Sequence, residues 1–535
     1  MLRKSNANLT PKENTPTVAC RTETMGDGES NTIMNLIFFD LLCNEPMQSS
    51  LKLTTYTANA PRIYGLPKVH KPGVPLRPVV SDIGGPTCEL ARFLASTLSP
   101  LGRCRYNVSN SLEVSRMVTG RILPEGHILA SLDVVSLFTN VPIGMLRVEV
   151  ERRYVEIEES TTLEKSDVMK ILDFCIDAGY FVFDGRIFRQ LDGVAMGSPL
   201  GPIAADIIMQ KVLNDVLEMS PLRIDFVIKY VDDLLIAVHS EDKHLLTEAF
   251  GSIHDRIKFT IELEQEGKLP YLDLNIHRDR ENKLSTSWYT KPSSSQRLLN
   301  YNSRHPRYTI VNVARNLIRR SRMLTTNPHE NADNQVANIL RKNDFPEGVI
   351  ERLMRQRGRP DTRGTVALAD QMEFVHTLTY IRGVSEKLQR KIMRATGIRV
   401  AFKPPRKVAE FFSHVKEPVP MDRRCDVVYS IPCKDCQKRY IGTTSQMLKN
   451  RLSGHKSDVG PPMRNSRVSS LCIHVAATGH EFDLKATKII DQHRNHRKRL
   501  ILEAAHIKKN LSRIVNRREE CADINIAYAA LLHET

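Results

Sequence analysis

The stretch that decides the fold is YVDD (230–233), which lies between the short apolar runs 226–228 and 234–237. Both runs are rich in residues that favour β-strands, so the pattern predicts a β-hairpin with two neighbouring carboxylates at its turn. Adjacent aspartates repel each other, and a divalent cation between them is the natural compensation. The alternative is an ordinary polar turn, because aspartate favours turns through its own local hydrogen bonds.

A second acidic strand end lies upstream, in the stretch SLDVVSLF (131–138), where Asp133 ends an apolar run. If this strand pairs with the hairpin, the carboxylates of Asp133, Asp232 and Asp233 converge on one point. Carboxylates grouped in this way can hold two Mg²⁺ (or Mn²⁺) ions about 3.5–4 Å apart, which clamp the attacking and leaving oxygens in phosphoryl transfer. The two stretches together therefore predict a metal-dependent phosphoryl-transfer site.

These stretches belong to a set that resembles, in one fixed order, the reverse transcriptases of Penelope-like retroelements. The others include YGLPKVHK (64–71), LRPVVS (76–81), GVAMGSPLGP (193–202), LPYLD (269–273) and YTKP (289–292). The resemblance runs from about residue 61 to residue 325 and resumes near residue 425. It implies an RNA-directed DNA polymerase that uses an RNA template, a DNA primer and dNTPs, in a right-hand fold of fingers, palm and thumb.

Three side chains take nucleotide-binding roles from this resemblance. Residues 61–82 are rich in proline, which favours extended strands and turns, and Lys68 and Arg77 in this stretch would contact the triphosphate or the template. A solvated, proline-stiffened loop is the alternative. Phe138 would exclude a 2′-hydroxyl by steric overlap and so select deoxynucleotides, whereas a core phenylalanine is the alternative.

Three further positions follow from the later motifs. The loop 193–202 contains three glycines and two prolines and precedes an expected helix over 203–217. Gly197 and Ser198 would lie against the base and sugar of the new pair, because glycine allows close backbone approach. Lys268 would protonate the leaving pyrophosphate as a general acid, and an exposed turn lysine is the alternative.

The composition favours a multidomain protein with a polyanionic partner. The chain has 535 residues, 41% of them hydrophobic, and a net charge of +16 with a pI near 9.4, which points to nucleic acid. No apolar run reaches the roughly twenty residues of a membrane span, and the N-terminus lacks the apolar core of a signal peptide. We therefore expect an intracellular protein without a membrane, whose ten cysteines are reduced thiols or metal ligands.

The C-terminal segment resembles a second family, the GIY-YIG endonucleases. Two short expected strands carry Tyr429 and Tyr440, and Tyr440 begins a complete YIG, whereas the first half of the motif has Ser-Ile in place of Gly-Ile. Arg451 and His455 follow at the spacing of one helical turn, so their side chains share a helix face.

This second resemblance implies a one-metal nuclease. Glu503, on an expected helix over 499–509, would hold a single Mg²⁺. The two tyrosines and His455 would provide a path for the proton of the nucleophile, and Arg451 would neutralise the phosphate. Asn516 is a weaker candidate.

The same segment contains two pairs of metal-binding residues, Cys433 with Cys436 and His474 with His480. Cysteine and histidine pairs suit tetrahedral Zn²⁺. The gap between the pairs is longer than in a DNA-reading finger, which favours a structural zinc, as in the endonuclease-bearing Penelope-like elements. Cys472 is a possible substitute ligand, and reduced cysteines without a metal are the alternative.

The sequence therefore predicts an α/β (α+β) chain with a right-hand polymerase (palm, fingers and helical thumb) followed by a small α/β nuclease. Its expected segments are a loose N-terminus (1–55), fingers and palm (56–300), a basic helical thumb that grips the duplex through phosphates (301–400), a proline-punctuated linker (401–424), the zinc-bearing endonuclease (425–525) and a tail (526–535).

One activity would nick target DNA and the other would extend the freed 3′-hydroxyl on RNA, in the nucleus, as target-primed integration of a retrotransposon requires. The family carries a basic Asp-Lys-Gly motif in a long N-terminal region, and this sequence contains no such motif. A truncated or decayed copy that binds nucleic acid, with nuclease activity only or with no catalysis, is therefore the alternative.

Overall fold

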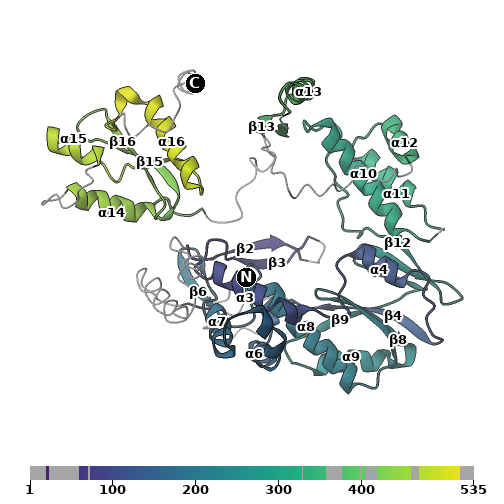
Figure 1. The fold of residues 1–535 in the computed structure, drawn as a ribbon. Helices are drawn as coiled ribbons and strands as arrows, with labels where there is room; N and C mark the ends of the chain where they lie inside the picture. Colours follow the sequence, from purple (N-terminus) through teal and green to yellow (C-terminus); the bar gives the residue numbers. More distant parts are fainter. Residues whose placement is uncertain are drawn as a thin grey trace.

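The computed structural model describes residues 20–22, 59–69, 73–327, 329–356, 376–397, 400–404, 411, 418–459 and 469–517. Within these residues the strands form five separate sheets flanked by helices, which confirms the mixed α/β character expected from the sequence (Figure 1). The expected tail 526–535 lies outside the described residues, as does most of the segment 1–55. Within that segment, β1 (Cys20–Thr22) is a strand that pairs with β6.

A four-stranded antiparallel sheet carries the acidic turn. Its strand order is β7-β8-β4-β9, so the strand with Asp133 lies between the acidic hairpin and β9. The two apolar runs beside YVDD form the expected hairpin, and Asp133 lies directly opposite Asp233 in the pairing of β4 with β8. The strands are β4 (His127–Val134), β7 (Ile224–Tyr230), β8 (Asp233–His239) and β9 (Phe259–Leu263).

Both faces of this sheet are buried. Side chains alternate between the faces of a strand, so Leu234 and Ile236 share a core with the helix α8, while Leu235 and Ala237 share another with β10–β12 and α10. Burial on both sides explains why β8 is a continuous apolar run. The helices that precede the thumb region are α3 (Cys88–Thr97), α4 (Ser111–Val118), α5 (Leu137–Asn140), α6 (Ile143–Arg152), α7 (Lys165–Asp177), α8 (Leu200–Met219) and α9 (Lys243–Ser252).

A second sheet, in the order β1-β6-β5-β2-β3, forms the region expected to be the fingers. The proline-rich stretch 61–82 folds into an antiparallel hairpin, as its turn residues predict. The turn Asp184-Gly185 has positive φ at both residues, 50° and 69°, which suits a tight hairpin. The strands are β2 (Arg62–Pro67), β3 (Leu76–Ser81), β5 (Tyr180–Phe183) and β6 (Arg186–Gln190).

The region expected to be the thumb begins with helices that pack on a third sheet. Buried side chains of these helices share one core with strands β10–β12 and with strands β4, β7 and β8. Figure 1 shows the helices grouped beside β12. The elements are β10 (Lys268–Tyr271), β11 (Leu274–Arg278), β12 (Leu284–Trp288), α10 (Arg307–Leu324), α11 (Ala332–Lys342) and α12 (Glu347–Arg355).

The end of this region differs from the expected all-helical thumb. Strands β13 (His376–Thr379) and β14 (Val400–Lys403) pair in parallel, with α13 (Ser385–Thr396) between them in the chain. Parallel neighbours need a crossover connection, which the helix supplies. Each strand is too short for a sequence pattern, and β14 extends into the expected linker 401–424.

The C-terminal segment is a three-stranded sheet, in the order β16-β15-β17, covered by helices. Tyr429 and Ile431 of β15 share one core with helices α14 and α15, and Val428 shares another with helix α16. The two short strands expected around the tyrosines are therefore present. The elements are β15 (Val427–Pro432), β16 (Arg439–Thr444), α14 (Leu448–Val459), α15 (Ser470–Thr478), β17 (Lys488–Gln492) and α16 (His496–Lys509).

The helices of the described residues were also compared with the requirements of a membrane span. In none of them are the length and the apolar character sufficient to cross a bilayer.

Candidate active sites

Three carboxylates from two strands converge at the acidic turn. Asp133 and Asp233 are register partners, Asp232 lies in the turn between β7 and β8, and one carboxylate oxygen of each lies within 4.8 Å of the others. Val231, in the same turn, has a φ of 55°, in the left-handed region that β-branched residues rarely adopt. The structure therefore brings together the three side chains that the sequence predicted to meet.

The electrostatics of this carboxylate cluster favour a bound cation. Burial raises the pKa of Asp233 to about 7, and the negative charges of Asp232 and Asp133 act in the same direction. The charge of Lys291 has the opposite, lowering effect on this pKa. Grouped carboxylate oxygens are ligands that Mg²⁺ prefers, so the three residues fit this ion, which would relieve their mutual repulsion.

Two residues beside the cluster had no assigned role in the sequence analysis. Lys291 acts electrostatically on Asp233, and the hydroxyl of Tyr271 donates a hydrogen bond of 3.0 Å to the backbone carbonyl of Asp233. Both lie in stretches that the motif order had marked, YTKP and LPYLD. The sequence thus pointed to the stretches but not to the individual side chains.

Lys268, the expected general acid, lies on the exposed face of its strand. It is the first residue of β10 and is exposed, whereas Leu269 and Tyr271 on the alternate face are buried. Because Tyr271 is the residue that reaches Asp233, strand alternation turns Lys268 away from the carboxylates. Among the described residues, Lys291 is the cation that lowers the pKa of Asp233.

The motif loop before α8 packs closely on its neighbours. A Cβ at Gly197 would lie 1.9 Å from the carbonyl oxygen of Val80, so only glycine fits beside strand β3. The hydroxyl of Ser198 accepts a hydrogen bond of 3.3 Å from the N–H of Leu200, at the start of α8. The helix therefore begins three residues earlier than the sequence indicated.

Phe138 lies on the short helix α5 and is half-buried. Its ring carbons would lie 3.4 Å from a Cβ at Gly201, so the ring packs on the N-terminal turn of α8. The Phe138 ring is thus packed on α8 on one side and partly exposed to solvent. Both interpretations of Phe138 remain compatible with its surroundings.

The two basic candidates lie on the hairpin of β2 and β3. Arg77 is exposed on β3 opposite Leu66, and Lys68 directly follows β2, where its N–H donates to the carbonyl of Pro75 at 2.9 Å. Residues 70–72 at the tip of this hairpin lie outside the described residues. The exposed guanidinium of Arg77 is available to an anionic ligand.

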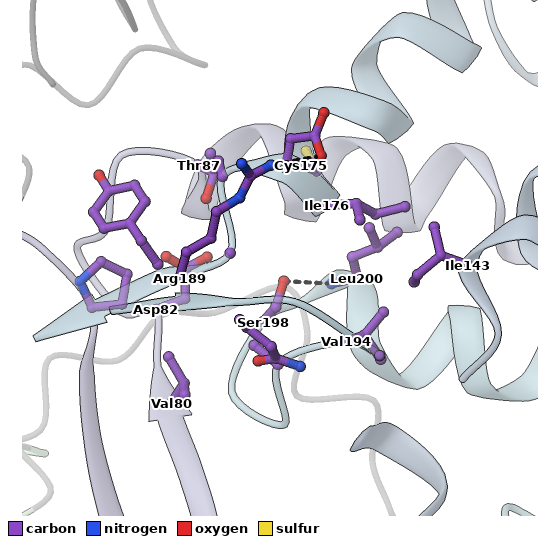
Figure 2. A pocket seen from close by; sticks show the side chains of 18 of the residues that line it. Val80, Asp82, Thr87, Ile143, Cys175, Ile176, Arg189, Val194, Ser198 and Leu200 are labelled. Atoms are coloured by element: carbon purple, nitrogen blue, oxygen red, sulfur yellow. Dashed lines mark hydrogen bonds and ion pairs between the residues drawn. The ribbon is translucent and has the colours of Figure 1, made fainter. Parts of the chain in front are cut away.

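A cavity of about 290 Å³ is lined in part by the loop 193–202. Figure 2 shows Thr87 and Cys175 side by side near the top, Asp82 at the lower left, and Ser198 and Leu200 nearer the centre. Asp82 is only 4% exposed, and its Oδ1 has no hydrogen-bond partner among the described residues. Burial raises the pKa of this carboxyl to about 7, and Arg92 opposes the shift.

In the C-terminal segment, a tyrosine, a histidine and an arginine meet in the core. The hydroxyl of Tyr429 lies 2.7 Å from Nε2 of His455 and accepts a hydrogen bond of 3.3 Å from Nε of Arg451. Arg451 and His455 therefore share a face of α14, as their spacing predicted. Burial lowers the pKa of His455 to about 4 and raises that of Tyr429 to about 12, so both groups are neutral at pH 7.

The second tyrosine and its glycine complete this site. The ring of Tyr440 lies 5.3 Å from that of His455, centroid to centroid. A Cβ at Gly442 would lie 2.7 Å from the hydroxyl of Tyr429, so the glycine makes room for that hydroxyl. Asn516 binds both the N–H and the C=O of Ile441, at 2.8 and 2.7 Å, which is a structural role.

Glu503 is half-buried on α16, and its charge raises the pKa of Tyr429. It therefore lies within electrostatic reach of the tyrosine. Unlike the palm carboxylates, it is not part of a group of three or more metal-binding side chains among the described residues. A metal at Glu503 would need further ligands from water or from the phosphate.

The four predicted zinc ligands converge. Their ligand atoms lie within 4.8 Å of one another, with Cys433 Sγ 3.7 Å from His480 Nδ1 and Cys436 Sγ 3.7 Å from His474 Nε2. Two thiols and two imidazoles are a donor set that fits tetrahedral Zn²⁺.

Cys472, the possible substitute ligand, lies elsewhere. It is buried on α15, and its sulfur accepts a hydrogen bond of 3.1 Å from the hydroxyl of Ser469. It is not one of the four grouped side chains.

Family models match two parts of the chain. Residues 89–261, which include Asp133, Asp232 and Asp233, match the family described as "Reverse transcriptase (RNA-dependent DNA polymerase)". The chain thus contains a reverse transcriptase domain. Residues 297–355, which span α10, α11 and α12, match the "Animal helix-turn-helix domain", a likeness that the sequence analysis did not anticipate.

Solved structures show distant similarity. A truncated apo telomerase from Candida tropicalis is 13% identical with a TM-score of 0.34, and the match covers 48% of this chain and 60% of the telomerase. For a Candida albicans telomerase with telomeric RNA the values are 11%, 0.35, 61% and 67%. For the RNA-dependent RNA polymerase of a human picobirnavirus they are 8%, 0.39, 63% and 73%. Scores at this level carry no argument about function, and no curated protein matches the sequence.

Proposed function

We propose that the protein is the RNA-directed DNA polymerase of a Penelope-like retrotransposon, coupled to a DNA-nicking endonuclease for target-primed integration. The observation that carries the polymerase part is the convergence of Asp133, Asp232 and Asp233 within a reverse transcriptase domain. Mg²⁺ held by these carboxylates supplies charge stabilisation for the attacking and leaving oxygens. The substrates are an RNA template, a DNA primer and dNTPs, and the proposed place of action is the nucleus.

The chain's own residues would position these substrates. Arg77 and Lys68 on the β2–β3 hairpin offer cations to the triphosphate, and Arg is well suited to phosphate because its donors are arranged as a fork. Phe138 would close the space of a 2′-hydroxyl, and Gly197 keeps the loop backbone against β3, where the new base pair would lie. Lys291 would stabilise the anionic form of Asp233 that metal binding requires.

The polymerase is tested by Mg²⁺-dependent dNTP incorporation on an RNA template with a DNA primer. The Asp232→Ala/Asp233→Ala variant should lose incorporation by more than about a hundredfold, because the metal ligands are removed. Binding of the RNA–DNA duplex, measured in parallel, should persist and serves as the control. A parent chain that binds the duplex without extending the primer would instead favour a truncated or decayed copy.

The endonuclease part rests on a different observation, the hydrogen-bonded group of Tyr429, His455 and Arg451. A neutral imidazole beside a phenol can take a proton, and the half-buried guanidinium of Arg451 can balance a phosphate charge. Glu503 is the carboxylate that would hold Mg²⁺ beside this group. Zn²⁺ on Cys433, Cys436, His474 and His480 would be structural, since all four donors would be used.

Nicking of supercoiled plasmid DNA tests this second activity. The Glu503→Gln variant keeps the size of the side chain but removes its charge, so nicking should fall by about a hundredfold or more while primer extension is unchanged. The Glu481→Gln variant, which alters an exposed carboxylate paired with Lys434, is the matched control. Equal nicking by parent and Glu503→Gln would contradict the assignment of this glutamate.

A further inference from the structure

The acidic turn that carries Asp232 holds a conformation that needs support. Val231 has a φ of 55°, a conformation that is strained for a β-branched residue and persists only where its surroundings impose it. Metal-binding aspartates also tolerate little displacement, because the two ions must be held at a fixed separation. We therefore looked for contacts from other segments that hold this turn in place.

The contact that meets this need comes from the LPYLD stretch. The hydroxyl of Tyr271 donates a 3.0 Å hydrogen bond to the carbonyl of Asp233, and it also interacts with the backbone of Tyr230. Tyr230 and Asp233 are the last register pair of the hairpin before the turn. One phenol thus contacts both strands at the base of the acidic turn.

Tyr271 is itself firmly held. It is 4% exposed, and its ring belongs to the core that contains Ile228, Leu235 and Trp288. The next residue, Leu272, has a φ of 55°, so a second tight turn follows at once. A hydroxyl on a fixed ring in a tight turn has little freedom to follow the hairpin, so it acts as a fixed point.

Asp273 ties the same segment to the helices of the 297–355 region. Its carboxylate accepts a hydrogen bond of 2.7 Å from Nε of Arg320 on α10 and another from the hydroxyl of Ser111 on α4. Its carbonyl accepts a hydrogen bond of 2.9 Å from the N–H of Tyr289, at the start of the stretch that contains Lys291. The segment 270–273 therefore joins the acidic turn to α4, α10 and the YTKP stretch.

We propose that Tyr271 is a positioning residue, which fixes the Asp232–Asp233 turn through its hydroxyl, with Asp273 anchoring the segment to α10. The inference deepens the proposed polymerase function and rests on it for its kinetic consequence. Its structural content, the rigidity of the turn, does not depend on activity.

Two measurements on matched variants test the proposal. Tyr271→Phe removes only the hydroxyl, and Tyr154→Phe is the control, because Tyr154 also donates to a carbonyl, that of Leu163 at 2.6 Å. Amide hydrogen exchange of the metal-free chain should become faster across the hairpin 224–239 in Tyr271→Phe and not in Tyr154→Phe. Primer extension should fall about tenfold in Tyr271→Phe, with a higher Mg²⁺ requirement and an unchanged KM for dNTP.

The outcomes separate the two claims. Unchanged exchange across the hairpin in a folded Tyr271→Phe variant would overturn the inference. Faster exchange in a chain whose parent does not extend primers would leave the inference standing and refute the proposed polymerase. If Tyr271→Phe fails to fold, Asp273→Asn tests the same segment from its other end, with a smaller, roughly threefold, acceleration of exchange as the expected result and no change as the contradicting one.

Discussion

The two proposed active sites are built in opposite ways. At the acidic turn, three carboxylates gather on partly exposed strand ends, and burial together with mutual repulsion raises the pKa of Asp233 to about 7. In the C-terminal segment, Tyr429 and His455 meet inside a core, and burial lowers the pKa of His455 to about 4. Each environment favours the neutral form of its group. The first site gathers carboxylates whose repulsion a cation would relieve, whereas the tyrosine–histidine pair of the second site is neutral by itself.

The four proposed zinc ligands offer the strongest way to separate the two regions. Cys436→Ser removes one of four ligands at a site where metal binding contributes directly to folding, so we expect loss of bound zinc and more than about a hundredfold loss of nicking. Primer extension should change less than about twofold, because the palm has a core of its own. Zinc content, nicking and extension are measured on the same preparation.

Cys472→Ser is the matched control for this experiment. Cys472 lies on α15, the helix that carries His474, but it contacts Ser469 and is not one of the four grouped ligands. Its variant should keep the full zinc content. Loss of zinc from Cys472→Ser, or retention by Cys436→Ser, would show that the ligand set is assigned wrongly.

The neutral tyrosine–histidine pair provides the next largest effect. Tyr429→Phe removes the hydroxyl that lies 2.7 Å from His455 and 3.3 Å from Arg451, so nicking should fall by about a hundredfold, as expected when a proton-transfer partner is lost. Ser430→Ala, at the next and equally buried position of β15, is the control and should nick normally. Equal losses in both variants would indicate damage to the strand instead of a chemical role for Tyr429.

The sequence anticipated the parts of these sites that depend on local pattern. Asp133 and Asp233 could be placed together because Asp133 lies near the end of one apolar strand and Asp233 at the turn of a predicted hairpin. Arg451 and His455 could be placed together because four residues make about one helical turn. The electrostatic effect of Lys291 on Asp233 could not be predicted, since it depends on how the YTKP stretch lies relative to the acidic turn. The contact of Tyr271 with Asp233 depends on how the third sheet packs on the palm, which no local pattern reveals. The parallel pair of β13 and β14 was missed because each strand has four residues.

The last expected effect concerns stability instead of activity: Asp82 and His455 give the two regions opposite responses to pH. The pKa of Asp82 is about 7 when folded and close to its ordinary value of 3.8 when unfolded, so the folded state binds more protons between these values. The stability contributed by the protonated carboxyl is complete below about pH 4 and is lost as the pH rises through 7. For His455, with a pKa of about 4 when folded and 6.5 as its ordinary value, the unfolded state binds the extra proton, and stability is lost as the pH falls from 6.5 toward 4.

Asp82→Asn isolates the first of these two responses. The amide cannot ionise, so at pH 8 the part of the chain around the cavity should be more stable than in the parent, by no more than about 4 kcal/mol, and should unfold at a higher temperature. At pH 4 the variant and the parent should unfold at similar temperatures. The metal-free chain is unfolded by heat at several pH values. Limited proteolysis during heating shows which fragments, from the palm or from the C-terminal segment, have unfolded, so each region is measured separately. The C-terminal region should keep its own pH dependence, since His455 is untouched. If the stability of both regions of the parent changed with pH in the same direction, the proposed effects of burial on Asp82 and His455 would be wrong.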